Sequence, residues 1–284
     1  MVHTYHQADR QRERTAREHQ TSTRKIREIA ALAKTDPEIV SRIVNAEITL
    51  RDAKEDSLER VRQQNIAAAL KTHVRGEGIH TGDMHLLFQK LVDGGVDLFI
   101  TDPPWDQESL PLYSELGKLA QQKLKPGGFC LVQCGVLYLD KVMARLSESL
   151  DWYWLFAAQF PGGNHAQIRQ RNISNSLRPI LAFVKRPAPK QPLNLWITDL
   201  VQSPKSEKGH HKHGQSVVEA QYYIEHLTLP GELIVDPFVG GGTIPEICAI
   251  TGRRFVGTEL DVGIAAAARA RVEAARLKLK ARTN

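Results

Sequence analysis

The sequence predicts an α/β protein with a doubly wound, mainly parallel sheet. First, from Gly76 onward, short apolar runs alternate with segments whose apolar residues follow helical spacing. Second, the runs VDLFIT and LIV end at acids, Asp102 and Asp236, as buried strands end at turn residues. Third, a run of glycines separates the second acid from a helical segment. Strands and helices that alternate in this way form a parallel sheet covered on both faces.

Each expected element follows from its local pattern. Strands are predicted at Ile79–Gly82, Val96–Thr101, Phe129–Gln133, Trp152–Phe160, Pro179–Val184, Leu233–Val235 and Phe255–Gly257. Helices are predicted at Met84–Val92, Tyr113–Leu124, Leu139–Leu150, Val217–Leu227, Thr243–Thr251 and Val262–Arg282. Two basic segments, Pro161–Arg178 and Lys185–Gln215, are expected to be loops.

Residues 1–75 differ from the rest and are predicted to form a helical region, with the main domain at 76–284. Helical spacing covers Thr23–Ala33 and Pro37–Asn45, and a further helix is expected to contain Leu58, Val61, Ile66, Ala69 and Leu70. The stretch before residue 22 has no apolar face and is expected to be disordered. DNA contact, dimerisation and a supporting helical layer are the alternatives for this region.

Composition limits the class of protein. The net charge of +6 suits a polyanionic partner. No apolar run approaches the roughly 18 residues that a membrane span needs, and the polar N-terminus has no signal-peptide core, so a cytoplasmic protein is expected. Cys130, Cys134 and Cys248 are expected to be buried thiols; a metal pair from the first two would lack two further ligands, and no metal site is predicted.

The turn after the predicted strand Val96–Thr101 has the sequence Asp-Pro-Pro-Trp. Two prolines cannot continue a strand, so Asp102 and Trp105 are expected together at its carboxyl end, where α/β sheets bind ligands. An acid, a rigid turn and an aromatic plane suit a planar base with an exocyclic amino group. The alternatives are a helix cap for Asp102 and core packing for Trp105.

The segment ELIVDPFVGGGTIPE predicts a second ligand site. Glycines there let a ligand approach the backbone, and Glu259, about twenty residues on, is placed to accept hydrogen bonds from a ribose or is simply a solvated acid. A dinucleotide is disfavoured because Pro245 stands at the third glycine position, and no Walker lysine follows. The acid Asp236 suits a ligand with a positive group, and S-adenosyl-L-methionine meets these requirements.

Together, DPPW at Asp102–Trp105 and DPFVGGGT at Asp236–Thr243 closely resemble the motifs of amino-methylating DNA methyltransferases. The order of the two motifs resembles the β-class, and the resemblance spans roughly Gly76 to Arg276. It implies a circularly permuted fold of the S-adenosylmethionine-dependent methyltransferase type. Many relatives carry Gln-Lys-Pro where this chain has Gly214-Gln215-Ser216, so no lysine role is carried over.

The residues and the resemblance together imply three sets of site residues. The catalytic set is Asp102, Pro103, Pro104 and Trp105. The cofactor set is Asp83, Thr101, Asp102, Gln215, Ser216, Asp236, Pro237, Phe238, Gly240, Gly242, Thr243, Glu259 and Leu260, in which Asp83 is equally well explained as a turn residue. The DNA-binding set is Arg169, Arg171, Asn172, Asn175, Arg178, Lys205, Lys208 and Lys212, with a solvated loop as the equal alternative.

The implied reaction is methyl transfer from S-adenosyl-L-methionine to adenine N6 in double-stranded DNA after base flipping. Asp102 and the Pro103 carbonyl are expected to accept the amino hydrogens, and Trp105 to stack on the base. The alternatives are a cytosine-N4 enzyme, an RNA or protein amide substrate, and a DNA-binding regulator with a silent methyltransferase domain. A homodimer and a separate restriction endonuclease are candidate partners, and the chain carries no endonuclease signature.

Overall fold

The computed structural model describes residues 23–35, 37–53, 56–57, 60, 77–159, 166–187, 196–202 and 217–283. The chain divides into two compact units, Met1–Gln64 and Asn65–Asn284, which are described separately. The predicted boundary near residue 75 falls outside the described residues.

The described residues of the first unit are largely helical, as predicted for this part of the chain. Helix α2 spans Thr23–Thr35 and α3 spans Pro37–Val44, while residues 50–53 begin a further helix. Thr49 and Asp52 start that helix with reciprocal bonds, each backbone N–H donating to the other's side chain at 3.1 Å, which is a capping box. The helix expected around Leu58–Leu70 lies largely outside the described residues.

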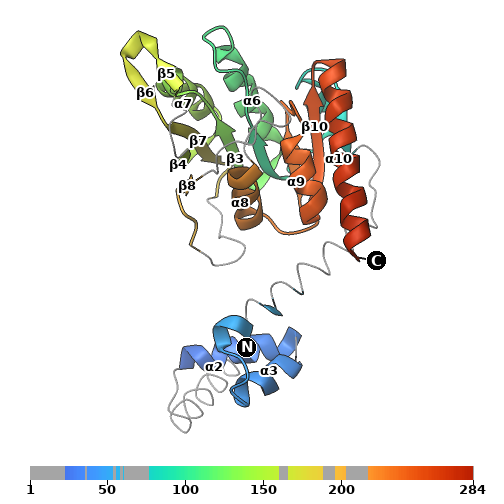
Figure 1. Cartoon of the computed structure of the whole chain (residues 1–284). Helices are drawn as coiled ribbons and strands as arrows, with labels where there is room; N and C mark the ends of the chain where they lie inside the picture. Colours follow the sequence, from blue (N-terminus) through green and yellow to red (C-terminus); the bar gives the residue numbers. More distant parts are fainter. Residues whose placement is uncertain are drawn as a thin grey trace. The chain divides into compact units, whose positions relative to one another are not determined.

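The second unit is built on an eight-stranded sheet in the order β1-β10-β9-β2-β3-β7-β4-β8 (Figure 1). Its strands are β1 Gly78–Thr81, β2 Val96–Thr101, β3 Leu124–Gln133, β4 Asp151–Gln159, β7 Leu177–Val184, β8 Leu200–Gln202, β9 Leu233–Asp236 and β10 Arg254–Glu259. Only β7 runs antiparallel to its neighbours, β3 and β4; all other pairs are parallel. The predicted fold class, a doubly wound and mainly parallel sheet, is confirmed.

Helices cover both faces of the sheet because successive strand residues point to opposite sides. Phe99 of β2 packs with α5, α6 and α7, whereas its neighbours Leu98 and Ile100 pack with α8 and α9. The helices are α5 Leu86–Lys90, α6 Leu110–Lys123, α7 Leu139–Ser147, α8 Val217–Leu227, α9 Thr243–Thr251 and α10 Val262–Thr283, with the short 3-10 turn η1 at Val136–Tyr138. Two apolar clusters, one on each face, form the core.

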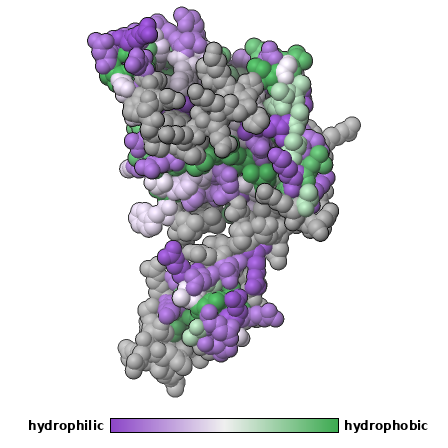
Figure 2. Space-filling view, in the orientation of Figure 1, coloured by the Kyte–Doolittle hydropathy of each residue, from purple (hydrophilic) through white to green (hydrophobic). Residues whose placement is uncertain are grey.

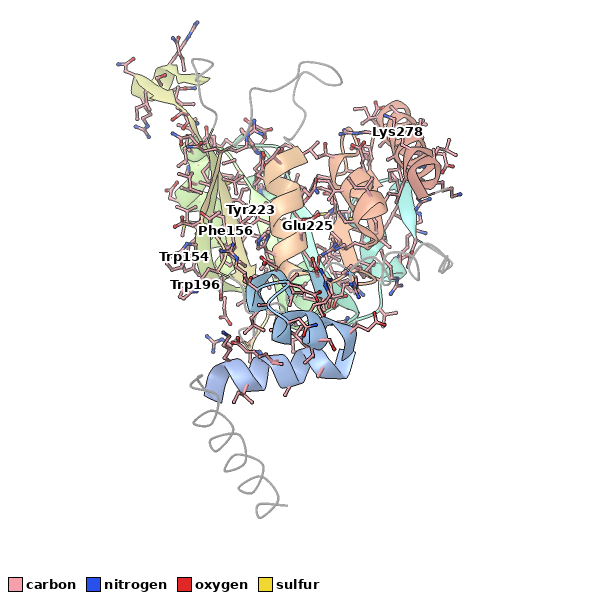
Figure 3. The ribbon with its side chains drawn as sticks, turned by 60° about the horizontal axis from the view of Figure 1, so that its bottom comes forward. Trp154, Phe156, Trp196, Tyr223, Glu225 and Lys278 are labelled. Carbon is pink, nitrogen blue, oxygen red and sulfur yellow. The ribbon has the colours of Figure 1, made fainter. Side chains whose placement is uncertain are left out.

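Helix α8 is fixed to the sheet by aromatic contacts. Tyr223 stacks on Phe156 of β4 with ring centroids 4.7 Å apart, and Figure 3 shows the two side chains next to each other. The Tyr222 hydroxyl accepts the Thr198 backbone N–H at 2.9 Å. In the first turn of α8, Glu219 lines a pocket together with Thr101 and Gln133, the last residues of β2 and β3.

Two predicted loops contain regular structure. In Pro161–Arg178, strands β5 (Ala166–Ile168) and β6 (Ile173–Asn175) form an antiparallel hairpin through η2 (Arg169–Arg171). The left-handed backbone of Asn172, at φ 54°, closes this turn, and asparagine tolerates that conformation well. In Lys185–Gln215, strand β8 extends the sheet beside β4. Both loop predictions were wrong here because three-residue strands are too short to show alternation.

Within the described ranges, no helix is long and apolar enough to cross a bilayer. On the face seen in Figure 2, apolar and polar residues mix along α10, whose Val262 and Leu277 are exposed. The three cysteines are buried, as expected, and burial raises the pKa of each thiol.

Candidate active site

The two predicted motifs meet at the centre of the sheet, because β2 and β9 are neighbouring parallel strands. From β9 the chain continues to β10 on one side, and from β2 it continues to β3 on the other. Such a reversal of strand order is a topological switch point, where open α/β sheets bind ligands. The Thr101 hydroxyl donates to Asp236 Oδ1 at 2.6 Å, so the two strand ends are also joined by a buried hydrogen bond. The central expectation, that both motifs share one site, agrees with this geometry.

The Asp-Pro-Pro-Trp turn is held in place by three contacts. Trp105 Nε1 donates to Asp102 Oδ1 at 2.8 Å. The hydroxyl of Tyr113, a buried residue of α6, donates to the Pro104 carbonyl at 3.0 Å. A Cβ added at Gly135 would lie 3.3 Å from the Trp105 side chain, so this ring packs directly on the backbone. Trp105 is nevertheless 42% exposed, which excludes the alternative of core packing.

Arg178, which the sequence predicts to bind DNA, lies at the start of β7 beside this turn. It is half-buried on β7, and its guanidinium carbon is 5.7 Å from the centre of the Trp105 ring, within cation–π range. When the side-chain amide of Gln133 is rotated so that its oxygen and nitrogen exchange places, both atoms find suitable hydrogen-bond partners. The Gln133 oxygen then accepts hydrogen bonds from Arg178 Nε and Nη1 at 3.2 Å each. Arg178 therefore joins the end of β3 to the aromatic ring of the turn.

The glycine loop after β9 is shaped by left-handed residues and by the end of β10. Gly240 and Gly242 have φ of 52° and 82°, which favour glycine. A Cβ at Gly242 would lie 2.9 Å from that of Ala268, so α10 packs against the loop. The Gly240 N–H donates to Glu259 Oε2 at 2.8 Å, and the Asp261 N–H donates to Oε1 at 3.0 Å. Glu259 is thus fixed at the loop and is not a freely solvated acid.

A guanidinium from α10 also braces this loop. Arg271 Nη1 donates to the Gly241 carbonyl at 3.0 Å and to the Thr243 hydroxyl at 3.2 Å. Its Nε donates to Glu246 Oε2 at 2.6 Å, which fixes the guanidinium in turn. The start of α9 and the loop before it are therefore held as one piece.

Among the acids of the site, Asp236 has the most strongly shifted pKa. Its side chain is 1% exposed, and burial raises its pKa to about 7, against hydrogen bonds from Thr101 and from the Phe238 N–H that lower it. The negative charges of Asp102 and Glu259 raise its pKa further. A cation at this position would favour the ionised form, as expected for a site that attracts positive charge.

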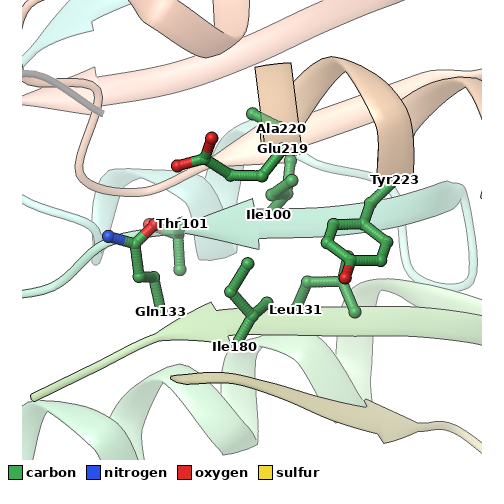
Figure 4. Close-up of a pocket in the computed structure, with 8 residues that line it drawn as sticks. All are labelled: Ile100, Thr101, Leu131, Gln133, Ile180, Glu219, Ala220 and Tyr223. Carbon is green, nitrogen blue, oxygen red and sulfur yellow. The ribbon is translucent and has the colours of Figure 1, made fainter. Parts of the chain in front are cut away.

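A small cavity opens beneath the first turn of α8. Figure 4 shows that the Glu219 carboxylate on α8 and the Gln133 amide on β3 point toward each other across it. Both residues are more than nine-tenths buried. The lining is completed by Ile100, Thr101, Leu131, Ile180, Ala220 and Tyr223. Because Thr101 also bonds Asp236, the cavity adjoins the point where the two motifs meet.

The remaining predicted residues divide into three groups. Asp83 follows β1, but its carboxylate accepts the His85 N–H at 2.8 Å and is largely exposed, which agrees with the turn interpretation. The hairpin carries Arg169, Arg171 and Asn172 in exposed positions, while Asn175 bonds the backbone of Leu177. Five predicted residues lie outside the described part of the chain: Lys205, Lys208, Lys212, Gln215 and Ser216.

Sequence reasoning missed several contacts at the site. Gln133 could have been found as the polar residue that ends the apolar run beside the catalytic strand. Glu219 and Arg271 gave no local signal, because each meets the site across a large sequence separation; Tyr113, only nine residues from Pro104, was predicted as a helix residue and not as a site residue. Among the described residues, no group of three histidine, cysteine, aspartate or glutamate side chains is arranged to hold a metal ion.

These observations define an α/β protein with a ligand site at a topological switch point, formed by an acidic proline turn and a glycine loop. A family model described as DNA methylase, for N6 and N4 methyltransferases, matches residues 96–270. The chain belongs to this family.

The comparisons also identify individual relatives. The type II methyltransferase M.BglII of Bacillus subtilis is 22% identical over 235 residues, which cover 64% of this chain. The matched region spans 65% of that relative's length. Among solved structures, the cytosine-N4-specific PvuII DNA methyltransferase is 19% identical with a TM-score of 0.61, covering 72% of this chain and 93% of its own.

Two further structures were determined with S-adenosyl-L-methionine. The M1.HpyAVI complex is 23% identical with a TM-score of 0.57, and covers 69% of this chain and 98% of its own. A DNA modification methylase of Thermus thermophilus is 17% identical with a TM-score of 0.58, and covers 70% of this chain and 95% of its own. At these identities the likeness concerns the fold.

Proposed function

We propose that this protein transfers a methyl group from S-adenosyl-L-methionine to the N6 amino group of adenine in double-stranded DNA. The observation that carries the proposal is the meeting of the Asp102 turn and the glycine loop at neighbouring strand ends, joined by the Thr101–Asp236 hydrogen bond. A methyl donor on one side and an acceptor nitrogen on the other would need such a shared site. Membership of the DNA methylase family supports methyl transfer to an amino group of DNA.

The residues around the glycine loop fit S-adenosyl-L-methionine. Left-handed Gly240 leaves the backbone open to close approach, whereas Gly242 lets α10 pack against the loop, and the carboxylate of Glu259 is held at the loop. A ribose would find its acceptor in Glu259, whose oxygens have capacity beyond their two backbone bonds. The acids Asp236 and Asp102 favour a ligand that carries positive charge. When bound, this cofactor supplies an electrophilic methyl group on a sulfonium.

The Asp102 turn would then prepare the amino nitrogen. An exocyclic amino group is a weak nucleophile because its lone pair is delocalised into the ring. Asp102 and the Pro103 carbonyl accept its two hydrogens, which helps the nitrogen to become pyramidal. The bond from Trp105 orients the carboxylate, and the exposed Trp105 ring offers a surface on which the base stacks. Positioning of this kind supplies a large part of the rate acceleration.

DNA contact is assigned to the exposed hairpin. Arg169 and Arg171 lie in its turn, where their guanidinium groups can reach phosphate oxygens. The lysines Lys205, Lys208 and Lys212 remain predictions from the sequence, as do the homodimer and the separate restriction endonuclease. A base flipped out of the duplex would reach the turn at a cost of ~a few kcal/mol, which stacking and hydrogen bonds offset.

Cytosine N4 is the second candidate, because its amino group presents the same two hydrogens to Asp102. The PvuII enzyme, which is cytosine-N4-specific, shares the fold. The adenine proposal depends on the acidic first residue of the Asp-Pro-Pro-Trp motif, since serine at that position is associated with cytosine N4 in the resembled family.

The test is methyl transfer from cofactor with a labelled methyl group to duplex DNA, to the matching single-stranded RNA and to protein. Digestion of the DNA to nucleosides and mass analysis then identifies the modified base. We expect N6-methyladenine in duplex DNA. N4-methylcytosine would correct the base, transfer only to RNA or protein would correct the substrate class, and DNA binding without any transfer would favour the silent regulator.

A further inference from the structure

Arg178 is fixed at the catalytic turn by two different kinds of contact. Its guanidinium lies over the Trp105 ring, and two of its N–H groups are directed at the Gln133 amide oxygen. Gln133 is 5% exposed at the carboxyl end of β3, next to the strand that ends at Asp102. The guanidinium is therefore aimed at the space around Asp102 and Trp105.

Arg178 also connects the hairpin with the catalytic turn. Strand β6 ends at Asn175, and β7 begins at Leu177, one residue before Arg178. The Asn175 side chain bonds both the N–H and the carbonyl of Leu177, at 3.2 and 3.0 Å, which makes this junction rigid. The exposed hairpin, where a nucleic acid would bind, therefore ends only a few residues before Arg178, whose cation faces the catalytic residues.

We propose that Arg178 reads the target base by donating a hydrogen bond to the ring nitrogen beside the amino group. This inference rests on the proposed function and deepens it. A flipped base whose amino group faces Asp102, and whose ring stacks on Trp105, must present its neighbouring ring nitrogen nearby. The guanidinium is a fork of five N–H donors without an acceptor, and with the Gln133 amide turned two of these donors face its oxygen.

The chemistry of the bases makes Arg178 selective. The ring nitrogen next to the amino-bearing carbon is N1 in adenine and N3 in cytosine, and both are unprotonated acceptors. In thymine N3 and in guanine N1 the corresponding nitrogen carries a hydrogen. Thymine or guanine would place this ring N–H against an N–H of the Arg178 guanidinium. Neither donor would then have an acceptor. Arg178 would therefore admit adenine or cytosine and reject the other two bases.

The experiment combines one change in the protein with one change in the base. Wild-type protein and Arg178→Gln are assayed for kcat/KM on duplex DNA that carries either adenine or 1-deazaadenine at the methylated position. The 1-deaza base keeps the amino group but lacks the ring acceptor. If nucleoside analysis gives N4-methylcytosine, 3-deazacytosine takes its place. Arg178→Lys keeps the positive charge without the planar fork, and Arg145→Gln, on the exposed end of α7, is the matched control.

For the wild-type protein and for Arg145→Gln, we expect 1-deazaadenine to lower kcat/KM by about tenfold or more, since hydrogen bonds to charged groups contribute ~1.5–3 kcal/mol. For Arg178→Gln we expect a similar loss of kcat/KM on adenine relative to the wild-type protein. Replacing adenine by 1-deazaadenine should then lower the kcat/KM of this variant only slightly further. This non-additivity is the signature of a direct contact.

Two results would overturn the inference while leaving the proposed function intact. One is a wild-type protein that methylates adenine and 1-deazaadenine equally well. The other is an Arg178 variant that loses activity on both bases by the same additional factor, because Arg178 would then act only through Trp105 and Gln133. If the wild-type protein methylates no duplex DNA, the proposed function itself fails, and the inference fails with it. If an Arg178 variant does not fold, the wild-type protein is still compared on adenine and 1-deazaadenine. This comparison can refute the contact without any variant.

Discussion

The buried carboxyl group of Asp236 should make the stability of the second unit depend on pH, and Asp236→Asn should remove this dependence. In the unfolded chain the carboxyl group titrates near 3.8, whereas burial raises its pKa to about 7 in the folded protein. Between these values the folded protein holds a proton that the unfolded chain has released. The free energy of unfolding therefore falls as the pH rises toward 7. The asparagine side chain keeps an oxygen acceptor for Thr101 and for the Phe238 N–H.

The size of the effect follows from the two pKa values. The interval from 3.8 to about 7 spans roughly three pH units, each equivalent to about 1.4 kcal/mol, or on the order of 4 kcal/mol in all. A comparison between pH 5 and pH 8 crosses roughly two of these units, so about 3 kcal/mol should be measurable. That is a large fraction of the ~5–15 kcal/mol that stabilises an ordinary domain.

The assay is urea unfolding followed by tryptophan fluorescence at both pH values. All four tryptophans, at positions 105, 152, 154 and 196, lie in the second unit, so the signal reports its unfolding. Other groups also titrate, and the wild-type protein is therefore compared with Asp236→Asn at each pH. We expect the variant to gain about 3 kcal/mol relative to the wild type between pH 5 and pH 8. A difference that stays constant with pH would refute the reasoning.

Three further substitutions test the supports of the site. Gly257→Ala should lower the free energy of unfolding by ~1–3 kcal/mol in urea titrations, because its Cβ would lie 2.5 Å from the Asp236 carbonyl oxygen; an unchanged midpoint would mean that the strands can separate freely. Tyr113→Phe removes one hydrogen bond to the backbone of the turn, and we expect a loss of about 1 kcal/mol with reduced methyl transfer, whereas full activity would show that the turn holds itself in place. Trp105→Phe keeps an aromatic plane but loses the N–H that orients Asp102, so kcat should fall more than KM rises; the reverse pattern in steady-state kinetics would assign Trp105 to base binding alone.

The strand ends of this protein could be predicted from the sequence. Buried parallel strands are continuous apolar runs, and the acids Asp102 and Asp236 mark where two of them stop. The family resemblance then indicated that the two motifs share a site, and the neighbouring positions of β2 and β9 agree with it. Long helices such as Val217–Leu227 were also predicted at their observed bounds, because several turns of apolar spacing are available to define them.

Other features depend on contacts that no local pattern records. The three-residue strands β5, β6 and β8 form because a partner strand is present, so their sequences look like loops. Strand β3 begins at Leu124, ahead of the predicted start at Phe129, because a register irregularity beside β2 accommodates the intervening glycines. Arg178 was predicted from its charge alone, and only the pairing of β7 with β3 brings it to Trp105.

The central claim is that the Asp102 turn and the glycine loop serve one methyl-transfer reaction, and Asp102→Asn tests it most directly. Asparagine keeps the shape of the side chain and an acceptor for Trp105 but removes the negative charge. The measurement compares binding of S-adenosyl-L-methionine with methyl transfer to duplex DNA, using Asp140→Asn on the exposed start of α7 as the matched control. We predict that the control retains both properties, and that Asp102→Asn binds the cofactor only modestly more weakly while its transfer rate at saturating cofactor falls by about a hundredfold or more. Wild-type transfer by Asp102→Asn would contradict the account.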